Sequence, residues 1–373
     1  MTMVRLPNGK HQIQITGTAT VISPTNFSVD YSEHNHLVVD RYIAEFIPAQ
    51  ALCHALDSGL IDALAEATYN LEQLAQGVAA EPQSTSLQLA LLVGNGVAAC
   101  SDNGVWCLTD QFAQTLRFRD LLEAKLEFSA LLAPDLLSAG ADFFTSLQRF
   151  MSSARTFELF DYQRCMTVNE ANLAATARWV KLTAAYTRYE AATLTDNLDL
   201  LEHRRLLDIG GNNGELALQL CRQLPELEAT VVDLPVVCEL GRRHLAETPE
   251  CSRVNFFDRN LLEQKAPGHY DLVTLKSLLH DWPNEGVEHF IERAWDALEP
   301  GGQLIIFERI ARDHGASLPS YGDLPIFVFA RFYRSPALYM QFLEQRKFVD
   351  IEQRSIELDW PFTLITARKP KSL

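Results

Sequence analysis

The chain has 373 residues, 47% of them hydrophobic, so it is long enough for about two globular domains. Acidic residues outnumber basic ones by 48 to 32, and the net charge of -16 repels phosphate backbones and anionic membrane surfaces. A nucleic-acid partner and a membrane partner are therefore disfavoured.

The cysteines also limit the classes of protein that fit. All seven are scattered, with no C-x-x-C pair, so the sequence indicates neither a disulfide framework nor a zinc site. No apolar run approaches the roughly 18 residues of a membrane helix, and residues 1–11 contain no apolar run at all. We therefore expect a cytoplasmic protein.

The first elements in chain order are helical. Residues 1–36 form an extension to which the sequence assigns no role. Between residues 37 and 64, apolar residues recur at helical spacing and are interrupted by Pro48 and Gly59. This pattern predicts two packed helices.

The next segment combines two short helices with a hairpin. Helical spacing covers residues 71–75 and 85–93, and short apolar runs then flank Asn103-Gly104, a strong hairpin signal because both central residues of a tight turn need positive φ. This order is typical of a winged helix. Such a module serves either DNA binding or packing and dimerisation, and we favour the latter because residues 85–93 contain no Lys or Arg.

Residues 110–200 have helical patterns throughout, and from residue 204 strands alternate with helices. This alternation is the signature of a doubly wound parallel sheet. The predicted strands are 205–209, 229–232, 254–257, 272–275 and 303–307, the predicted helices are 215–224, 236–247 and 285–298, and the late runs 349–353 and 362–367 could close the sheet as an edge hairpin.

A glycine-rich turn follows the first of these strands. Asp208 and Ile209 end the strand, and Gly210-Gly211 open the turn that leads into a helix at Gly214. Glycines let the backbone approach a ligand closely. Because Asn212 occupies the second glycine of the dinucleotide pattern, a pyrophosphate site is not favoured, and the turn indicates either a nucleotide-like ligand or a plain tight turn.

An acidic residue ends the second strand. Asp233, followed by Leu234-Pro235, is well placed to accept both hydroxyls of a ribose, although it could also serve as a helix N-cap. The turn and this acid together indicate a nucleoside without a diphosphate.

Five ordered motifs carry a resemblance to a known family. They are Asp-x-Gly-Gly-x-x-Gly at 208–214, Asp-Leu-Pro at 233–235, a Gly-Asp-Met-Phe-like segment at 257–260, Leu-Lys-x-x-Leu-His-Asp-Trp at 275–282, and a strand that ends in Glu308. Over about residues 40–370 the chain resembles the S-adenosylmethionine-dependent small-molecule O-methyltransferases of the caffeate, flavonoid and bacterial natural-product type.

The resemblance implies an architecture. We expect a doubly wound, mostly parallel, seven-stranded Rossmann-like sheet and an amino-terminal, mainly helical, winged-helix-like dimerisation domain. The expected domains are an extension (1–36), a helical dimerisation and substrate-cradling domain (37–200) and an S-adenosylmethionine-binding catalytic domain (201–373). The expected partners are a small-molecule acceptor and a second copy of the chain.

The resemblance also implies the site residues. His280 and Glu308 would be catalytic, and the cofactor-binding residues would be Asp208, Gly210, Gly211, Gly214, Asp233, Leu234, Asp258, Arg259 and Lys276. Among these, Gly210 would lie against the amino-acid portion of the cofactor, Asp233 would hold the ribose, and Asp258 would sit beside the adenine. S-adenosylhomocysteine would be the product. The scattered acids form no ligand cluster, so we expect no metal.

By the same resemblance, His280 would be a general base. Transfer of a proton from a phenol (pKa about 10) to a histidine (pKa about 6.5) is uphill by roughly 5 kcal/mol, so we expect proton removal to be coupled to methyl transfer. Glu308 would fix the imidazole tautomer and stabilise the imidazolium. A histidine at a strand end is more often structural, and Glu308 could instead be a solvated charge.

The chain departs from the family pattern at three positions. Tyr333 stands where a second carboxylate is often found, and Phe257 and Arg259 replace the usual Gly and Met around Asp258. Alternative functions on the same scaffold are C- or N-methylation, or other chemistry with the bound cofactor. Candidate residues for the acceptor pocket are Phe157, Phe160, Tyr162, Met166, Trp179, Phe327, Phe329 and Phe332.

Overall fold

The structure is a computed structural model and describes residues 2–5, 11–14, 35–311 and 319–371. The chain forms two compact units, residues 1–35 and residues 36–373. In the first unit, strands β1 (Thr2–Arg5) and β2 (His11–Gln14) pair antiparallel. The domain boundary that we placed at residue 200 stays a prediction.

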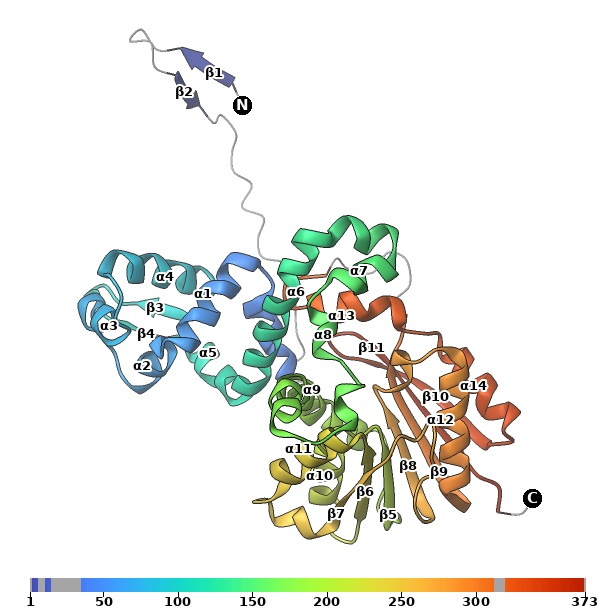
Figure 1. The fold of residues 1–373 in the computed structure, drawn as a ribbon. Coiled ribbons are helices and arrows are strands. Elements are labelled where there is room, and N and C mark those ends of the chain that lie inside the picture. Colours follow the sequence, from blue (N-terminus) through green and yellow to red (C-terminus); the bar gives the residue numbers. More distant parts are fainter. Residues whose placement is uncertain (1, 6–10, 15–34, 312–318, 372–373) are drawn as a thin grey trace. The chain divides into compact units, whose positions relative to one another are not determined.

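The amino-terminal part of the second unit is mainly helical (Figure 1). Its elements are η1 (Asn35–Ile43), α1 (Phe46–Asp57), α2 (Leu60–Glu66), α3 (Leu71–Gly77), α4 (Pro82–Gly94), β3 (Ala98–Cys100), β4 (Trp106–Leu108), α5 (Asp110–Thr115), η2 (Leu116–Phe118), α6 (Arg119–Thr145), α7 (Leu147–Ser153), α8 (Thr156–Leu159), η3 (Arg164–Met166) and α9 (Glu170–Asp196). Two helices and a hairpin follow one another as predicted, while the winged-helix assignment and its role in dimerisation stay predictions.

One of the two helix breaks expected in this part is wrong. Pro48 does not interrupt a helix but lies in the first turn of α1, where a missing amide hydrogen costs nothing because the first amides of a helix lack intrahelical partners. The break after α1 is at Gly59, whose φ of 79° suits glycine.

The β3–β4 hairpin forms, but its turn is not the predicted type. Gly104 has a φ of 75°, whereas Asn103 is not among the residues with positive φ. The amide of Gly104 donates to the carbonyl of Ser101 at 2.9 Å, and the amide of Ser101 donates to the carbonyl of Val105 at 2.9 Å. The connection is therefore a longer loop with one left-handed glycine, a common hairpin alternative.

Seven strands form one sheet in the order β10-β11-β9-β8-β5-β6-β7. They are β5 (Arg205–Ile209), β6 (Glu228–Asp233), β7 (Val254–Asp258), β8 (Tyr270–Lys276), β9 (Leu298–Arg309), β10 (Val349–Glu357) and β11 (Pro361–Arg368). The five strands from β9 to β7 are parallel, and β11 and β10 add an antiparallel hairpin at the β9 edge, as predicted.

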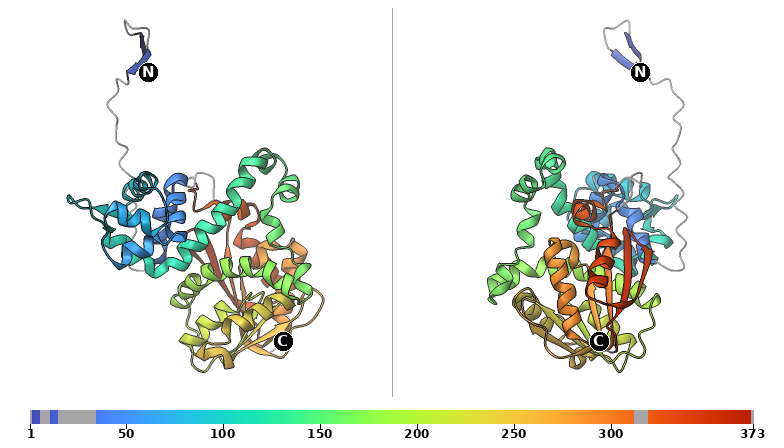
Figure 2. Two further views of the ribbon diagram at one scale, coloured as in Figure 1. Left: turned by 60° about the vertical axis from the view of Figure 1, so that its left-hand side comes forward. Right: turned by 90° about the vertical axis from the view of Figure 1, so that its right-hand side faces the viewer.

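Helices cover both faces of this sheet (Figures 1 and 2). Leu206 faces the side covered by α9 and α10, and its neighbour Leu207 faces the side covered by α12 and α14. This alternation with a period of two, on a sheet buried on both faces, explains the continuous apolar runs of the sequence. The covering and connecting helices are α10 (Glu215–Gln223), α11 (Pro235–Leu245), η4 (Pro249–Arg253), η5 (Leu279–Asp281), α12 (Asn284–Ala297), α13 (Leu324–Phe329), η6 (Ala330–Phe332) and α14 (Pro336–Gln345).

The strand order also predicts where a ligand would bind. From β5 the chain moves outward to β6 and β7, and it then returns to place β8 and β9 on the other side of β5. Ligands of open α/β sheets bind at the carboxyl ends of the strands beside such a reversal. Over the described ranges, no helix is long and apolar enough to cross a membrane.

Candidate active site

A cavity of about 820 Å³ lies at the carboxyl ends of the central strands. The glycine turn after β5, the end of β6 and the end of β8 line it on the sheet side. Helix α9 lines it with Trp179, Thr183, Tyr186, Thr187 and Glu190, which share one helix face because they recur every three or four residues.

The glycine turn is tightly enclosed. Gly210 has a φ of 66°, and a Cβ there would lie 2.7 Å from Cδ1 of Leu278. A Cβ on Gly211 would lie 2.4 Å from Oδ2 of Asp208 and 2.9 Å from Cγ1 of Val231. Neither position has room for a side chain, so the backbone itself forms this wall of the cavity.

Asp233 ends β6 with its carboxylate held by the backbone. Oδ2 accepts from the amide of Asn212 at 2.8 Å, and Oδ1 accepts from the amide of Leu234 at 2.7 Å. Burial raises the pKa of Asp233 to about 6, although the two amides oppose this shift. Each oxygen keeps a lone pair, so the carboxylate can accept hydrogen bonds from a ligand. Asp233 and Leu234 both line the cavity.

Asp208 lies beneath the turn. Its Oδ1 accepts from the hydroxyl of Thr274 at 2.7 Å, while Oδ2 is buried with no hydrogen-bond partner among the described residues. Burial raises the pKa of Asp208 to about 7, more than Thr274 and Lys276 lower it. A buried carboxyl oxygen without a partner in a cavity wall is suited to a ligand donor.

Lys276 belongs to a buried cluster of charges. Its Nζ lies 2.5 Å from Oε2 of Glu190 and 3.2 Å from the hydroxyl of Thr187. The other oxygen of Glu190 accepts from Nη2 of Arg309 at 2.5 Å. Burial raises the pKa of Glu190, but the two cations more than offset this, so the pKa lies below its usual range. All three charged side chains line the cavity.

Of the three remaining predicted cofactor residues, one lines the cavity and two do not. Arg259 lines the cavity, with its guanidinium 4.4 Å from the ring centre of Phe257. Asp258 is not among the lining residues; its side chain is 53% exposed and lies 3.5 Å from Arg242. Gly214 also lies outside the lining and precedes the first residue of α10.

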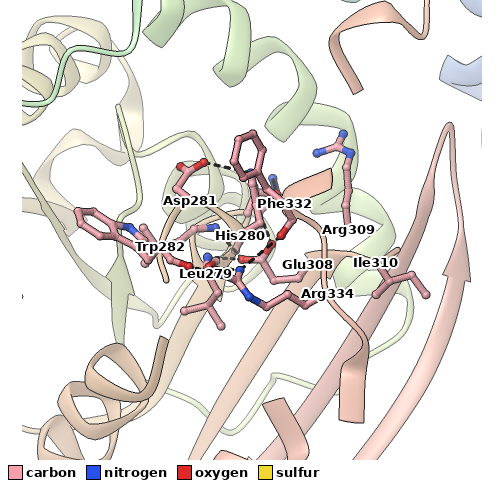
Figure 3. A network of polar contacts seen from close by, with 12 residues as sticks. Leu279, His280, Asp281, Trp282, Glu308, Arg309, Ile310, Phe332 and Arg334 are labelled. Atoms are coloured by element: carbon pink, nitrogen blue, oxygen red, sulfur yellow. Dashed lines mark hydrogen bonds and ion pairs between the residues drawn. The ribbon is translucent and has the colours of Figure 1, made fainter. Parts of the chain in front are cut away.

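His280 lies in the short turn η5 after β8, with Glu308 behind it (Figure 3). Nδ1 of His280 is 2.9 Å from Oε2 of Glu308. Oε1 of Glu308, which is fully buried, accepts from the amides of Leu278 and Leu279 at 2.7 and 2.6 Å. Because the carboxylate acts as an acceptor throughout, Nδ1 carries the hydrogen and Nε2 of the neutral ring has the free lone pair.

Two further contacts define the surroundings of His280. Burial lowers its pKa, but the charges of Asp281 and Glu308 together outweigh burial, so the pKa lies above its usual range. The turn is fixed by Arg334, whose Nη1 donates to the carbonyl of Leu279 at 2.9 Å and whose Nη2 donates to the carbonyl of Trp282.

Tyr333, which by the resemblance stands where a second carboxylate is often found, packs against His280. Its ring meets the imidazole of His280 edge-on, with 5.3 Å between ring centres and an angle of 84°. Burial raises the pKa of Tyr333, which therefore stays protonated at neutral pH. An aromatic wall thus replaces a negative charge on this side of His280.

Most of the candidate acceptor-pocket residues line the cavity. They are Phe157, Phe160, Tyr162, Met166, Trp179, Phe329 and Phe332, together with Phe128 and Met151, which sequence analysis did not single out. Phe327 is the exception, since it packs 5.5 Å from the ring of Phe143 and does not reach the lining. Within the ranges that the structure describes, no three His, Cys, Asp or Glu side chains gather as a metal site.

This combination of a seven-stranded doubly wound sheet, a glycine turn and an acid at the end of the next strand defines the class I methyltransferase fold. The fold of human N-acetylserotonin methyltransferase, solved with S-adenosylmethionine, is similar, with a TM-score of 0.66 over 93% of this chain and 100% of that chain at 20% sequence identity. At this identity, the similarity supports the fold alone.

The sequence comparisons identify the family. The O-methyltransferase domain family matches residues 157–344, about half of the chain, and the chain belongs to that family, whose members use S-adenosylmethionine. A 3-hydroxy-5-methyl-1-naphthoate 3-O-methyltransferase of Streptomyces sahachiroi is 35% identical over 123 residues, 33% of this chain and 36% of that enzyme. A demethylspheroidene O-methyltransferase of Rhodobacter capsulatus is 26% identical over 322 residues, 83% of this chain and 76% of that enzyme. The match to the Streptomyces enzyme therefore spans about a third of its length.

Some residues of the site escaped the sequence analysis. Glu190 and Arg309 are buried charges of the cavity wall, and only the helical spacing of polar residues along α9 could have indicated the first of them. Asp281 was noted only as part of a motif, and its contact with Tyr162 at 2.8 Å joins residues far apart in sequence.

Proposed function

We propose that the protein transfers a methyl group from S-adenosylmethionine to a hydroxyl of a small aromatic molecule, with His280 as the general base. The observation that carries this proposal is that His280, which is paired with the buried Glu308, lines the same cavity as the Gly210-Gly211 turn and Asp233. The His280–Glu308 pair can accept a proton, and the glycine turn and Asp233 can bind a nucleoside.

The residues at the sheet edge fit the cofactor. Asp233 offers a lone pair on each oxygen for the ribose hydroxyls, and the glycine turn allows the close approach of an elongated ligand. The unpartnered Oδ2 of Asp208 can accept from the amino group of the methionine portion. Leu234, Arg259 and Lys276 would complete this site, and we keep Gly214 and Asp258 as members, although they would act from outside the cavity lining.

When bound, S-adenosylmethionine supplies the methyl group and leaves as S-adenosylhomocysteine. His280 accepts the proton of the acceptor hydroxyl at Nε2 as the oxygen forms its new bond to carbon. Glu308 holds the hydrogen on Nδ1 and stabilises the imidazolium that results. Because Asp281 and Glu308 raise the pKa of His280, the proton transfer from a phenol is less uphill than to an unperturbed histidine.

The aromatic wall supports a flat acceptor. Phe157, Phe160, Phe329 and Phe332 line the cavity, and aromatic rings favour stacked and edge-on contacts with another ring. The Streptomyces relative is named for a hydroxynaphthoate, which is a flat aromatic compound. We also propose that the protein is a homodimer, since Leu137 and Phe144 of α6 are 87% and 76% exposed and apolar.

Calorimetric titration with S-adenosylhomocysteine tests the cofactor site. We expect micromolar binding by the wild type and a loss of at least about 30-fold, or roughly 2 kcal/mol, in Asp233→Ala, because the ribose hydroxyls lose a charged acceptor. Asp102→Ala, which removes an exposed carboxylate of the β3–β4 loop, is the matched control and should bind like the wild type. If the folded wild type binds neither S-adenosylhomocysteine nor S-adenosylmethionine, the proposed function is wrong.

A further inference from the structure

Tyr162 extends from the segment between α8 and η3 to the turn that carries His280. Its hydroxyl donates to Oδ2 of Asp281 at 2.8 Å. Its ring stacks on Trp282, with 6.0 Å between ring centres and an angle of 19°. A single side chain from the helical part of the chain therefore contacts both residues that follow His280, and it does so in the wall of the cavity.

His280 lies between two carboxylates, one near each ring nitrogen. Glu308 is 2.9 Å from Nδ1, whereas Oδ1 of Asp281 is 3.5 Å from Nε2. Charge-assisted hydrogen bonds between nitrogen and oxygen are usually about 2.7–2.9 Å long, so the contact with Asp281 is too long for a strong one. Asp281 instead uses its other oxygen for the hydroxyl of Tyr162.

This geometry matters because Nε2 is the nitrogen with the free lone pair. If Asp281 turned toward His280, it would bind the protonated Nε2 tightly and compete with the acceptor hydroxyl for that position. The hydrogen bond from Tyr162 opposes such a turn, since the turn would break this 2.8 Å contact between the hydroxyl and Oδ2 of Asp281.

We propose that Tyr162 is a positioning residue, which holds Asp281 at this distance and so keeps Nε2 of His280 available to the acceptor hydroxyl. This proposal rests on the assignment of His280 as the general base. It gives the irregular segment between α8 and η3 a part in setting the basicity of the proposed catalytic histidine.

The charged and titratable groups around His280 determine the direction of the expected effect. Glu308 and Arg309 face it from β9, Asp281 from η5, and Tyr333 from the segment after η6. Burial lowers the pKa of His280, Asp281 and Glu308 raise it, and Arg309 lowers it. For Asp281, burial raises the pKa, while His280 and the hydrogen bond from Tyr162 lower it.

Removal of the Tyr162 hydroxyl should therefore raise the pKa of His280. Without its partner, the carboxylate of Asp281 moves closer to Nε2, and a closer negative charge favours the imidazolium. Methyl transfer needs the neutral imidazole, so a higher pKa moves the rise in activity to higher pH. The loss of activity should be largest at low pH and should disappear well above the pKa.

The test uses Tyr162→Phe, which removes only the hydroxyl and keeps the ring on Trp282. We expect the pKa of His280, followed by NMR of the ¹⁵N-labelled imidazole in the cofactor-free protein, to rise by about half to one unit. The acid limb of kcat/KM should move by the same amount, which lowers kcat/KM at low pH by about three- to tenfold. The imidazole resonance that is missing in the His280→Gln variant is assigned to His280.

A double-mutant cycle separates positioning from a general structural effect. In Asp281→Asn, the charge on which Tyr162 acts is gone, so adding Tyr162→Phe should produce no further change in the pKa of His280. Tyr69→Phe, which removes a hydroxyl from the distant β3–β4 region, should leave the pKa unchanged.

Three results would overturn the proposal: an unchanged His280 pKa in Tyr162→Phe, an equal shift with and without the charge of Asp281, or the same shift in Tyr69→Phe. Failure of the proposed function has a different signature. In that case the NMR pKa rises as expected, but His280→Gln retains activity and the pH profile lacks an acid limb of that pKa.

Discussion

At the scale of single residues, a buried ammonium group ties the helical part of the second unit to the sheet. Lys125 of α6 is 1% exposed, and its Nζ lies 2.5 Å from Oδ1 of Asp40 and 3.1 Å from Oδ2 of Asp359. Asp359 lies 3.8 Å from Arg309, which pairs with Glu190 at the cavity. Charges of alternating sign therefore run from η1 to the cavity wall, and loss of one leaves its neighbours unpaired.

We expect Lys125→Met to lower the free energy of unfolding by about 3 kcal/mol, because it leaves Asp40 without its cation and the buried Asp359 with only the more distant Arg309. Burial raises the pKa of Asp40 to about 6, and Lys125 opposes that shift. In the variant this pKa rises further. A carboxyl group whose pKa is higher in the folded than in the unfolded protein makes the protein less stable as the pH rises. The loss of unfolding free energy in Lys125→Met should therefore be smaller at pH 5 than at pH 8.

Chemical denaturation at both pH values measures this effect. Arg149→Ala is the control, since the ion pair of Arg149 with Asp142 is 65% and 37% exposed and should contribute less than about 1 kcal/mol. A Lys125→Met protein as stable as the wild type at pH 8 would show that the buried pairs do not couple α6 to the sheet.

At the scale of elements, the turn from β5 to α10 is the part of the fold that shapes the proposed cofactor site. We expect Gly211→Ala to weaken binding of S-adenosylhomocysteine by at least about tenfold, or 1.4 kcal/mol, because the new Cβ would lie 2.4 Å from Oδ2 of the buried Asp208. Either the turn or the carboxylate must then move. Calorimetry measures the affinity, and circular dichroism checks the fold.

Gly94→Ala is the matched control for this substitution. Gly94 ends α4, and a Cβ there would meet nothing within 4 Å. Alanine is the better helix former, so this variant should keep the affinity of the wild type and lose no stability. Equal affinities of Gly211→Ala and the wild type would mean that the turn does not approach the ligand closely.

Sequence patterns predict the sheet well where apolar runs are continuous. The predicted strand 205–209 coincides with β5, and each of the other parallel strands is found within a few residues. The prediction 303–307 is too short, because β9 begins at Leu298 and includes Gly301 and Gly302. Glycines usually end a strand pattern, but here Leu298, before the two glycines, still pairs with Tyr270 of β8 across a register shift.

The sequence predicts the contacts of the site only where regular strands bring the residues together. The contact of His280 with Glu308 follows from two adjacent parallel strand ends, which sequence motifs locate. The contact of Tyr162 with Asp281 starts from an irregular segment between short helices, whose path has no periodic signal. Asp258 lies on β7, the edge strand of the sheet in the described part of the chain, and its carboxylate is turned to Arg242.

At the scale of the whole molecule, the proposed function depends on two parts of the second unit that line one cavity. The sheet edge contributes the glycine turn, Asp233 and His280, and the helical part contributes the aromatic wall from α8 to α9. On the function proposed above, the aromatic wall and Tyr333 would decide which acceptor fits. The net charge of -16 accords with a small-molecule acceptor rather than a nucleic acid.

The measurement that tests this function most directly is methyl transfer from labelled S-adenosylmethionine to a panel of phenols, with wild type and His280→Gln compared in parallel. We predict that the wild type methylates at least one phenol and that His280→Gln loses about 10²–10⁴-fold in kcat/KM, the range typical of a general base, while its affinity for S-adenosylhomocysteine stays within about twofold. Equal kcat/KM values for the two proteins, with binding intact, would contradict the assignment of His280 as the base of an O-methyltransferase.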